Sequence, residues 1–195
     1  MGVEIRHLQA CDLRVQLDAL AFLRIAVFED YPYLYAGDIE YERKYLSQFA
    51  QAKGSILVAA YADDRLVGAA TASPLESQKP ELCELFAHRD YATDRMFYFG
   101  ESVLLPEFRG NGIGHRFFDG REAAAREAGA THATFCAIVR DDDDPARPDD
   151  YRSLEPFWRK RGYEPQPGLQ MPLSWEEHGS TGEIDHTMQF WLGAL

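Results

Sequence analysis

A glycine-rich segment between a strand-like run and a helix-like run constrains this chain most. Small and apolar residues lead to Pro106, and glycines then occupy positions 110, 112 and 114 at the start of a helical pattern. Glycine lets a ligand approach the backbone without meeting a Cβ atom, and the first turn of a helix leaves N–H groups without partners. The segment therefore predicts an anion site suited to a diphosphate.

Two known phosphate loops do not fit the spacing. A Walker-type loop ends in Gly-Lys-Ser/Thr, whereas His115 and Arg116 follow Gly114 here. A dinucleotide fingerprint spaces its glycines as G-x-G-x-x-G, whereas this chain has G-x-G-x-G. A glycine-rich turn without a ligand is the remaining structural alternative.

A third pattern does fit. Residues 109–114, Arg-Gly-Asn-Gly-Ile-Gly, resemble the Arg/Gln-x-x-Gly-x-Gly/Ala signature of the GNAT superfamily of acyl-CoA-dependent N-acyltransferases. Residues 157–163, which end in Gly-Tyr, resemble the Tyr-x-x-x-Gly-Phe segment that closes the CoA site of that family. The resemblance implies that the loop holds the CoA pyrophosphate and that the preceding strand aligns the pantetheine arm. The implied acetyl-CoA contacts are Ser102, Val103, Leu104, Arg109, Gly110, Asn111, Gly112, Ile113, Gly114 and His115.

The rest of the chain predicts elements in an order similar to that family. We expect one α/β domain over residues 1–195, with the GNAT fold: a central, mixed and mostly antiparallel sheet flanked by helices. The predicted elements are a strand at 3–8, a helix from Asp12 to Pro32, a helix from Asp38 to Gly54, a hairpin at 55–61 and 65–73, a short helix from Pro80, a central strand at 95–105, a helix to Ala128, a strand at 131–139, a helix at 154–162 and a last strand at 187–192.

Charge and composition exclude several function classes. The net charge of -12 argues against nucleic acid and against anionic membrane surfaces, which both require a basic excess. No signal-peptide core or membrane-spanning run is visible, so we expect a cytoplasmic protein. Cys11, Cys83 and Cys136 show neither a disulfide framework nor zinc spacing, so no metal is expected.

Acyl transfer to an amine needs a general base near the nucleophile. Glu101 is the candidate, because it is an ionisable residue inside an otherwise apolar strand. The alternative is a structural carboxylate paired with an arginine. Tyr98 would face the opposite side of a regular strand, but a bulge would bring both side chains to one face.

The leaving thiolate needs a proton, and here the chain departs from the family. Trp158 stands where many members carry a tyrosine acid, and Arg140 lies in the region of an expected asparagine. Tyr163 is the candidate acid, with Tyr151 or solvent as alternatives. By the resemblance, backbone N–H groups of residues 102–104 address the thioester carbonyl.

The acceptor side is expected to involve three segments that vary within the family, at residues 31–37, around 80–94 and at 141–150. Tyr31, Tyr33 and Tyr35 are candidate substrate contacts, although each is equally well explained by core packing. Residues 140–150 form an acidic loop that is either simply solvated or attracts a protonated amine. His115 either contacts phosphate or covers the first turn of its helix.

The resemblance implies an acetyl-CoA-dependent N-acetyltransferase that acts on a primary amine of a small molecule or peptide. One alternative is an acyl-CoA-binding module or sensor without turnover. Another is a regulator that binds nucleotide phosphates, although the lysine expected of such a loop is absent. By the resemblance alone, a homodimer is expected.

Overall fold

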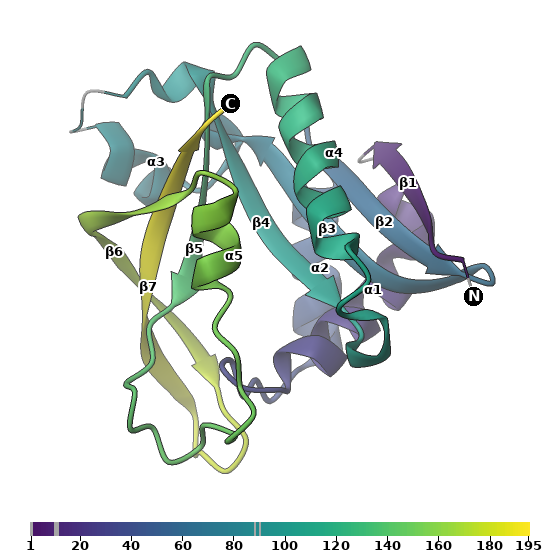
Figure 1. Ribbon diagram of the computed structural model, residues 1–195, viewed down its shortest axis with the longest axis vertical. Coiled ribbons are helices and arrows are strands. Elements are labelled where there is room, and N and C mark those ends of the chain that lie inside the picture. The colour runs from purple at the N-terminus through teal and green to yellow at the C-terminus, as the bar shows by residue number, and fades with distance from the viewer. Residues whose placement is uncertain (1, 10–11, 88, 90) are drawn as a thin grey trace.

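The computed structural model describes residues 2–9, 12–87, 89 and 91–195 (Figure 1). Cys11 lies outside the described residues. The strands are β1 (Glu4–Gln9), β2 (Ile56–Ala62), β3 (Arg65–Pro74), β4 (Met96–Leu104), β5 (His132–Ile138), β6 (Glu164–Glu176) and β7 (Glu183–Ala194). The helices are α1 (Leu13–Phe28), α2 (Ile39–Phe49), α3 (Pro80–Ala87), α4 (Ile113–Glu127) and α5 (Glu155–Lys160).

The described strands form one 7-stranded sheet in the order β1-β2-β3-β4-β5-β7-β6. Only β4 and β5 pair in parallel, and every other neighbouring pair is antiparallel. The parallel pair is joined through α4, as a parallel connection requires. The predicted mixed, mostly antiparallel sheet is therefore confirmed.

One strand was not predicted from the sequence. β6 contains Pro165, Pro167 and Pro172, each of which lacks a backbone donor and interrupts a strand pattern. It lies at the edge of the sheet, where such residues are tolerated, and its register with β7 shifts between Pro165 and Gln170. The prolines explain why the sequence pattern concealed it.

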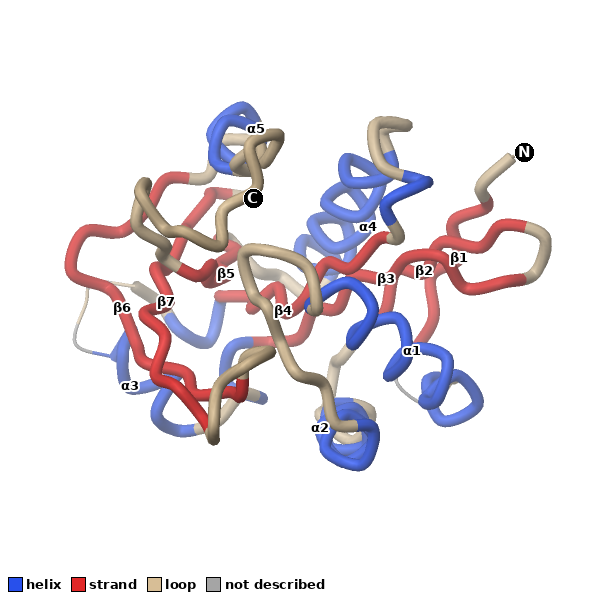
Figure 2. Tube along the Cα trace, turned by 90° about the horizontal axis from the view of Figure 1, so that it is seen from below, coloured by secondary structure: helices blue, strands red, loops and turns tan. Residues whose placement is uncertain are grey.

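Helices cover both faces of the sheet. Figure 2 shows α4 and α5 on one side and α1 and α2 on the other. On the α1 and α2 side, Leu20 and Leu46 pack with Val103 of β4. On the α4 side, Phe99 and Phe118 pack with other aromatic rings. β4 is therefore buried between two cores.

Several helix ends follow the predicted signals. The Asp38 side chain caps α2 by accepting a hydrogen bond from the N–H of Tyr41 at 2.6 Å. Gly54, Gly129 and Gly162 follow their helices with φ values of 77°, 83° and 86°. Such left-handed backbone favours glycine, which explains why Gly129 and Gly162 end α4 and α5. The predicted stop at Gly54 is wrong, because α2 already ends at Phe49 and Gly54 lies in the turn that follows.

The buried face of α4 includes two charged residues. Arg121 and Glu122 are buried there, whereas Ala128, just after the last residue of the helix, is exposed. The Arg121 guanidinium lies over the rings of Phe99 and Phe118, 4.5 and 4.6 Å from their centroids. Burial lowers the pKa of Arg121 to about 10. Aromatic faces thus accommodate a cation that an apolar pattern does not predict.

Candidate functional site

The glycine loop lies at the end of β4, before the first turn of α4. Gly110 and Gly112 have φ values of 77° and 74°, and a Cβ atom added to either would meet no atom within 4 Å. The space over both residues is therefore open, and their backbone conformation is one that side chains disfavour. Asn111 closes the turn by donating from Nδ2 to the carbonyl oxygens of Phe108 and Arg109 at 3.3 and 3.1 Å.

The loop presents a run of unused donors. Within the described residues, no backbone N–H from 110 to 115 donates a hydrogen bond to a protein acceptor. Gly112 is the N-cap of α4 and has no side chain to satisfy the first turn. The N–H groups and the positive end of the helix dipole therefore converge on open space, which is the chemistry of an anion site.

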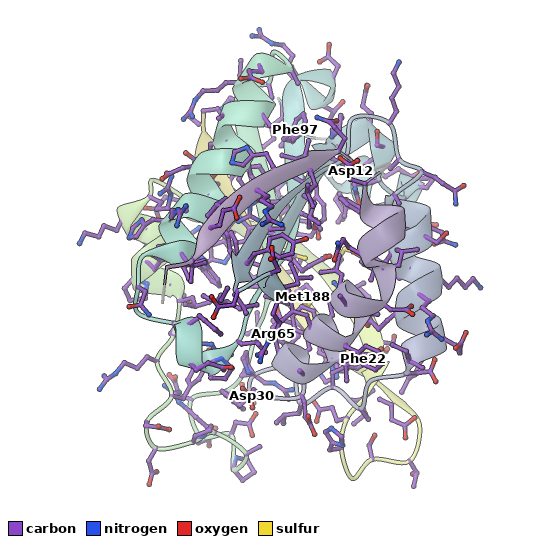
Figure 3. All side chains as sticks on the ribbon, turned by 90° about the vertical axis from the view of Figure 1, so that its right-hand side faces the viewer. Asp12, Phe22, Asp30, Arg65, Phe97 and Met188 are labelled. Atoms are coloured by element: carbon purple, nitrogen blue, oxygen red, sulfur yellow. The ribbon has the colours of Figure 1, made fainter. Side chains whose placement is uncertain are left out.

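The larger side chains of this loop brace it. Arg109 donates from Nε to the carbonyl oxygen of Leu104 at 3.2 Å, and its Nη2 lies 3.7 Å from Oδ2 of Asp30. Figure 3 places Asp30 in the lower half of the molecule, the end at which β4 finishes. The His115 ring packs on Phe157 with centroids 4.9 Å apart. These contacts hold the loop between α1 and α5.

β4 and β5 separate beside this loop. Their parallel pairing covers only three residues of each strand and ends at Tyr98 and Thr134, and beyond that point β5 pairs with β7 alone (Figure 1). Ser102 is exposed although its strand is central in the sheet. Residues 102–104 thus pair with β3 on one side and have no β5 partner on the other.

β4 carries the bulge that would bring Tyr98 and Glu101 to one face. Ala70 of β3 pairs with Ser102, and Ala72 pairs with Phe99. One β3 residue, Thr71, therefore lies opposite Gly100 and Glu101 together. The extra residue turns Glu101 toward α1 and α2.

Glu101 lies in a buried network of charges. Arg24 of α1 approaches Oε2 of Glu101 from Nη1 at 2.9 Å and donates from Nε to Glu42 of α2 at 2.5 Å. Tyr45 donates its hydroxyl to the same Glu101 oxygen at 3.2 Å, and burial, followed by the Glu101 charge, raises the pKa of Tyr45 well above its usual range. The second oxygen, Oε1, is buried without a hydrogen-bond partner among the described residues. Glu101 thus has an arginine partner and one unused acceptor.

Arg24 and Glu42 were not identified from the sequence. Arg24 stands in an otherwise apolar run of α1, at the spacing of one helical turn from Leu20 and Phe28. A lone charge on a buried helix face indicates a buried partner. That signal was present, but the partners lie on α2 and β4 and are not identified by local spacing.

Tyr163 and Glu101 lie on opposite faces of the sheet. Tyr163 is 2% exposed, contacts Phe118 on the α4 side, and donates its hydroxyl to Glu122 at 3.2 Å. Burial raises its pKa well above the usual value, and the Glu122 charge adds to the effect. Trp158 packs on Phe135 with ring centroids 5.1 Å apart. The structure does not bring Tyr163 to the Glu101 network.

The three candidate tyrosines of the loop between α1 and α2 point to different neighbours. Tyr31 packs edge-to-face on Tyr151 at 4.7 Å, and Tyr33 packs on Trp175 at 5.8 Å. The Tyr35 pKa is raised by burial and by the charge of Glu42. Tyr31 and Tyr33 therefore border the loop after β5 and the β6–β7 hairpin, whereas Tyr35 faces the buried charge network.

Cys136 lies on the same side as Tyr33 and Tyr98. Its Sγ is 3.4 Å from the Tyr98 hydroxyl, so this contact joins β4 and β5 where they begin to separate. Burial raises the Cys136 pKa to about 11. Burial thus favours the protonated thiol.

The part of the chain that the structure describes offers neither a grouping of metal ligands nor a helix suited to span a membrane. No group of three or more His, Cys, Asp or Glu side chains in it is arranged to hold a metal ion. None of its helices combines the length and the apolar character needed to cross a bilayer.

Comparisons with known proteins agree with this geometry. The family model described as "Acetyltransferase (GNAT) family" matches residues 20–163. No curated protein matches the chain in sequence. Among solved structures, a ribosomal-protein-alanine N-acetyltransferase from Brucella melitensis is 17% identical, with a TM-score of 0.60 over 98% of this chain and 99% of that one.

Two further solved structures share the fold and were determined with coenzyme A. An aminoglycoside 6'-N-acetyltransferase is 17% identical, with a TM-score of 0.62 over 100% of this chain and 97% of that one. The PaiA N-acetyltransferase from Thermoplasma acidophilum is 15% identical, with a TM-score of 0.56 over 97% of this chain and 98% of that one. At these identities the likeness concerns the fold.

Proposed function

Because the chain belongs to the GNAT acetyltransferase family, we propose that it transfers the acetyl group of acetyl-CoA to a primary amine of a small molecule or peptide. One observation carries the proposal: the unused N–H groups of residues 110–115 lie beside the separation of β4 from β5. The N–H groups suit a diphosphate, and the separation of the strands leaves room for the extended pantetheine arm along β4.

In this proposal the chain holds the donor mainly through its backbone. N–H groups of the glycine loop bind the pyrophosphate, and residues 102–104 border the pantetheine arm. Acetyl-CoA, when bound, supplies an activated thioester. The carbonyl of that thioester is addressed by N–H groups of the same strand, which are pre-ordered by pairing with β3 on the other side.

Glu101 is proposed as the general base. Arg24 and Tyr45 both bind its Oε2 and thereby orient the carboxylate. Oε1, which is buried and has no hydrogen-bond partner among the described residues, is the oxygen proposed to accept the proton from an amine or an intervening water. The bulge at Gly100 is what turns this carboxylate to the acceptor face. Tyr163 is instead proposed to support the core between α4 and β5, because its hydroxyl is bound to buried Glu122.

The acceptor is proposed only as an amine. Names among the related structures include a ribosomal-protein-alanine enzyme and an aminoglycoside enzyme, so one fold accommodates very different acceptors. The cytoplasmic location and the homodimer stay predictions from the sequence.

The experiment is thiol release from acetyl-CoA over a panel of polyamines, aminoglycosides and peptides. We expect one class to release free CoA with an equal amount of acetylated amine. Glu101→Gln should lower kcat by about 100-fold or more, as general bases typically do, while acetyl-CoA still binds. Glu127→Gln, on the exposed end of α4, is the matched control and should leave turnover unchanged.

The outcomes separate the alternatives. Saturable acetyl-CoA binding without turnover on any amine would favour an acyl-CoA-binding module. Binding of ATP in preference to CoA would favour a nucleotide-phosphate regulator. Normal turnover by Glu101→Gln would show that Glu101 is not the general base.

A further inference from the structure

Three segments that are distant in sequence meet where β4 and β5 have separated. They are the loop at 31–37, the loop at 140–151 and the β6–β7 hairpin at 173–186, and together they are called the acceptor wall below. Figure 1 shows them side by side at the lower left of the molecule. The first two are among the three segments that the sequence assigned to the acceptor side; the third, around residues 80–94, is not part of this wall.

Backbone contacts join the hairpin to the first loop. Ala36 donates its N–H to the carbonyl oxygen of Glu176 at 2.8 Å, and His178 donates to that of Leu34 at 3.0 Å. The Trp175 indole donates from Nε1 to the carbonyl oxygen of Tyr33 at 2.9 Å. The hairpin thus fixes the backbone that carries the candidate substrate tyrosines.

Arg140 is the side chain that contacts all three segments of the acceptor wall. It follows β5 and donates from Nε to the carbonyl oxygen of Pro32 at 2.8 Å. Its Nη2 donates to Glu177 of the hairpin, and its Nη1 lies 3.7 Å from Oδ2 of Asp144. Its guanidinium also lies 5.9 Å from the centroid of the Tyr31 ring.

Burial makes these contacts effective. The side chains of Arg140, Asp144 and Glu177 are only 17%, 14% and 15% exposed, so solvent screens them less than the exposed ion pairs of the surface. The planar guanidinium supplies hydrogen bonds in fixed directions to a carbonyl and one carboxylate while its charge lies near a second carboxylate, which a lysine ammonium cannot match from one position. Without the Arg140 cation, the partly buried carboxylates of Asp144 and Glu177 would lose this positive partner.

We infer that Arg140 is a positioning residue that sets the acceptor side of the site, by holding the tyrosine loop against the loop after β5 and the hairpin. This inference rests on the proposed acetyl transfer to an amine. The donor side is built separately from the glycine loop and α4, where Arg140 makes no contact in the described structure. Arg140 therefore governs amine binding and not acetyl-CoA binding.

The test compares Arg140→Met, Arg140→Lys and Arg152→Met. Arg152 is exposed, directly follows that loop, and is the matched control. With the amine identified by thiol release, Arg140→Met should raise the amine KM by about 10-fold or more, consistent with lost hydrogen bonds to charged groups. The acetyl-CoA dissociation constant should stay within about twofold of wild type. Arg140→Lys should recover only part of the loss.

A second readout does not need turnover. Hydrogen exchange of peptides that contain Ala36 and His178 should become at least about 10-fold faster in Arg140→Met, since their N–H groups bond across the braced segments. Exchange in residues 113–127 should not change. Arg152→Met should match wild type in both regions.

Two results would overturn the inference. One is an Arg140→Met protein whose exchange and amine KM equal those of Arg152→Met. The other is an equal loss of amine and acetyl-CoA affinity, which would mean general destabilisation. If wild type turned over no amine, the proposed function would fail, while the exchange comparison would still decide whether Arg140 braces the wall.

Discussion

Substituting Gly100 tests whether the β4 bulge positions Glu101. A Cβ atom at Gly100 would lie 2.4 Å from Oγ1 of Thr71, and real Cβ contacts essentially never fall below 3.0 Å. Either the two strands separate locally by about 0.6 Å or the Thr71 side chain leaves its rotamer, and such overpacking costs about 1–3 kcal/mol. Glu101 follows directly, so we expect Gly100→Ala to lower kcat by about 10- to 100-fold.

The compensating change is Thr71→Ala. The Thr71 hydroxyl is buried without a hydrogen-bond partner among the described residues, so its removal alone should change stability little. In the double variant Thr71→Ala/Gly100→Ala the next nearest atom to the new Cβ is Thr71 Cβ at 3.7 Å, an ordinary contact. We expect the double variant to regain most of both stability, measured by urea unfolding, and kcat. A neutral Gly100→Ala, or a double variant as impaired as the single one, would refute the reasoning.

Three further predictions concern buried polar groups. Arg24→Met should lower the free energy of unfolding by about 3–5 kcal/mol, because it leaves two buried carboxylates without their cation; a loss below 1 kcal/mol in urea unfolding would contradict this. Tyr163→Phe should cost about 1 kcal/mol through the lost bond to Glu122 and leave kcat unchanged, whereas a large fall in kcat at unchanged stability would restore Tyr163 as the acid. Burial lowers the pKa of His186 below its unfolded value of about 6.5, so the unfolded chain takes up the proton first and the stability of wild type falls as pH drops through about 6.5. The melting temperature of wild type should therefore fall relative to that of His186→Gln between pH 7.5 and about pH 5.5. A difference in melting temperature that stays constant over this range would contradict the prediction.

Local features of the sequence predicted much of the fold. The glycines that end α4 and α5 each need a left-handed backbone, and Asp38 caps α2 with its own side chain. The pattern of strands and helices around the glycine loop led to the correct sheet class. Each of these signals involves residues a few positions apart, so each can be recognised within one short segment of the sequence.

What escaped prediction depends on contacts between distant segments. β6 is a strand because β7 pairs with it, although its prolines oppose that assignment. The Arg24, Glu42 and Glu101 network joins three elements, and Arg140 joins three more. The face on which Glu101 lies is decided by one extra residue in β4, which becomes visible only in its register with β3.

Calorimetric titration with acetyl-CoA tests the donor site most directly, using Gly112→Asp against Gly129→Asp. The two glycines have φ values of 74° and 83°, and an added Cβ meets nothing within 4 Å at either, so the backbone strain is matched. Aspartate tolerates this conformation, and at residue 112 its charge would face the diphosphate at a cost of roughly 1–3 kcal/mol. We predict that wild type and Gly129→Asp bind acetyl-CoA alike and that Gly112→Asp binds it about 10- to 100-fold more weakly. Equal binding by all three proteins, or no binding by folded wild type, would contradict a donor site at the glycine loop.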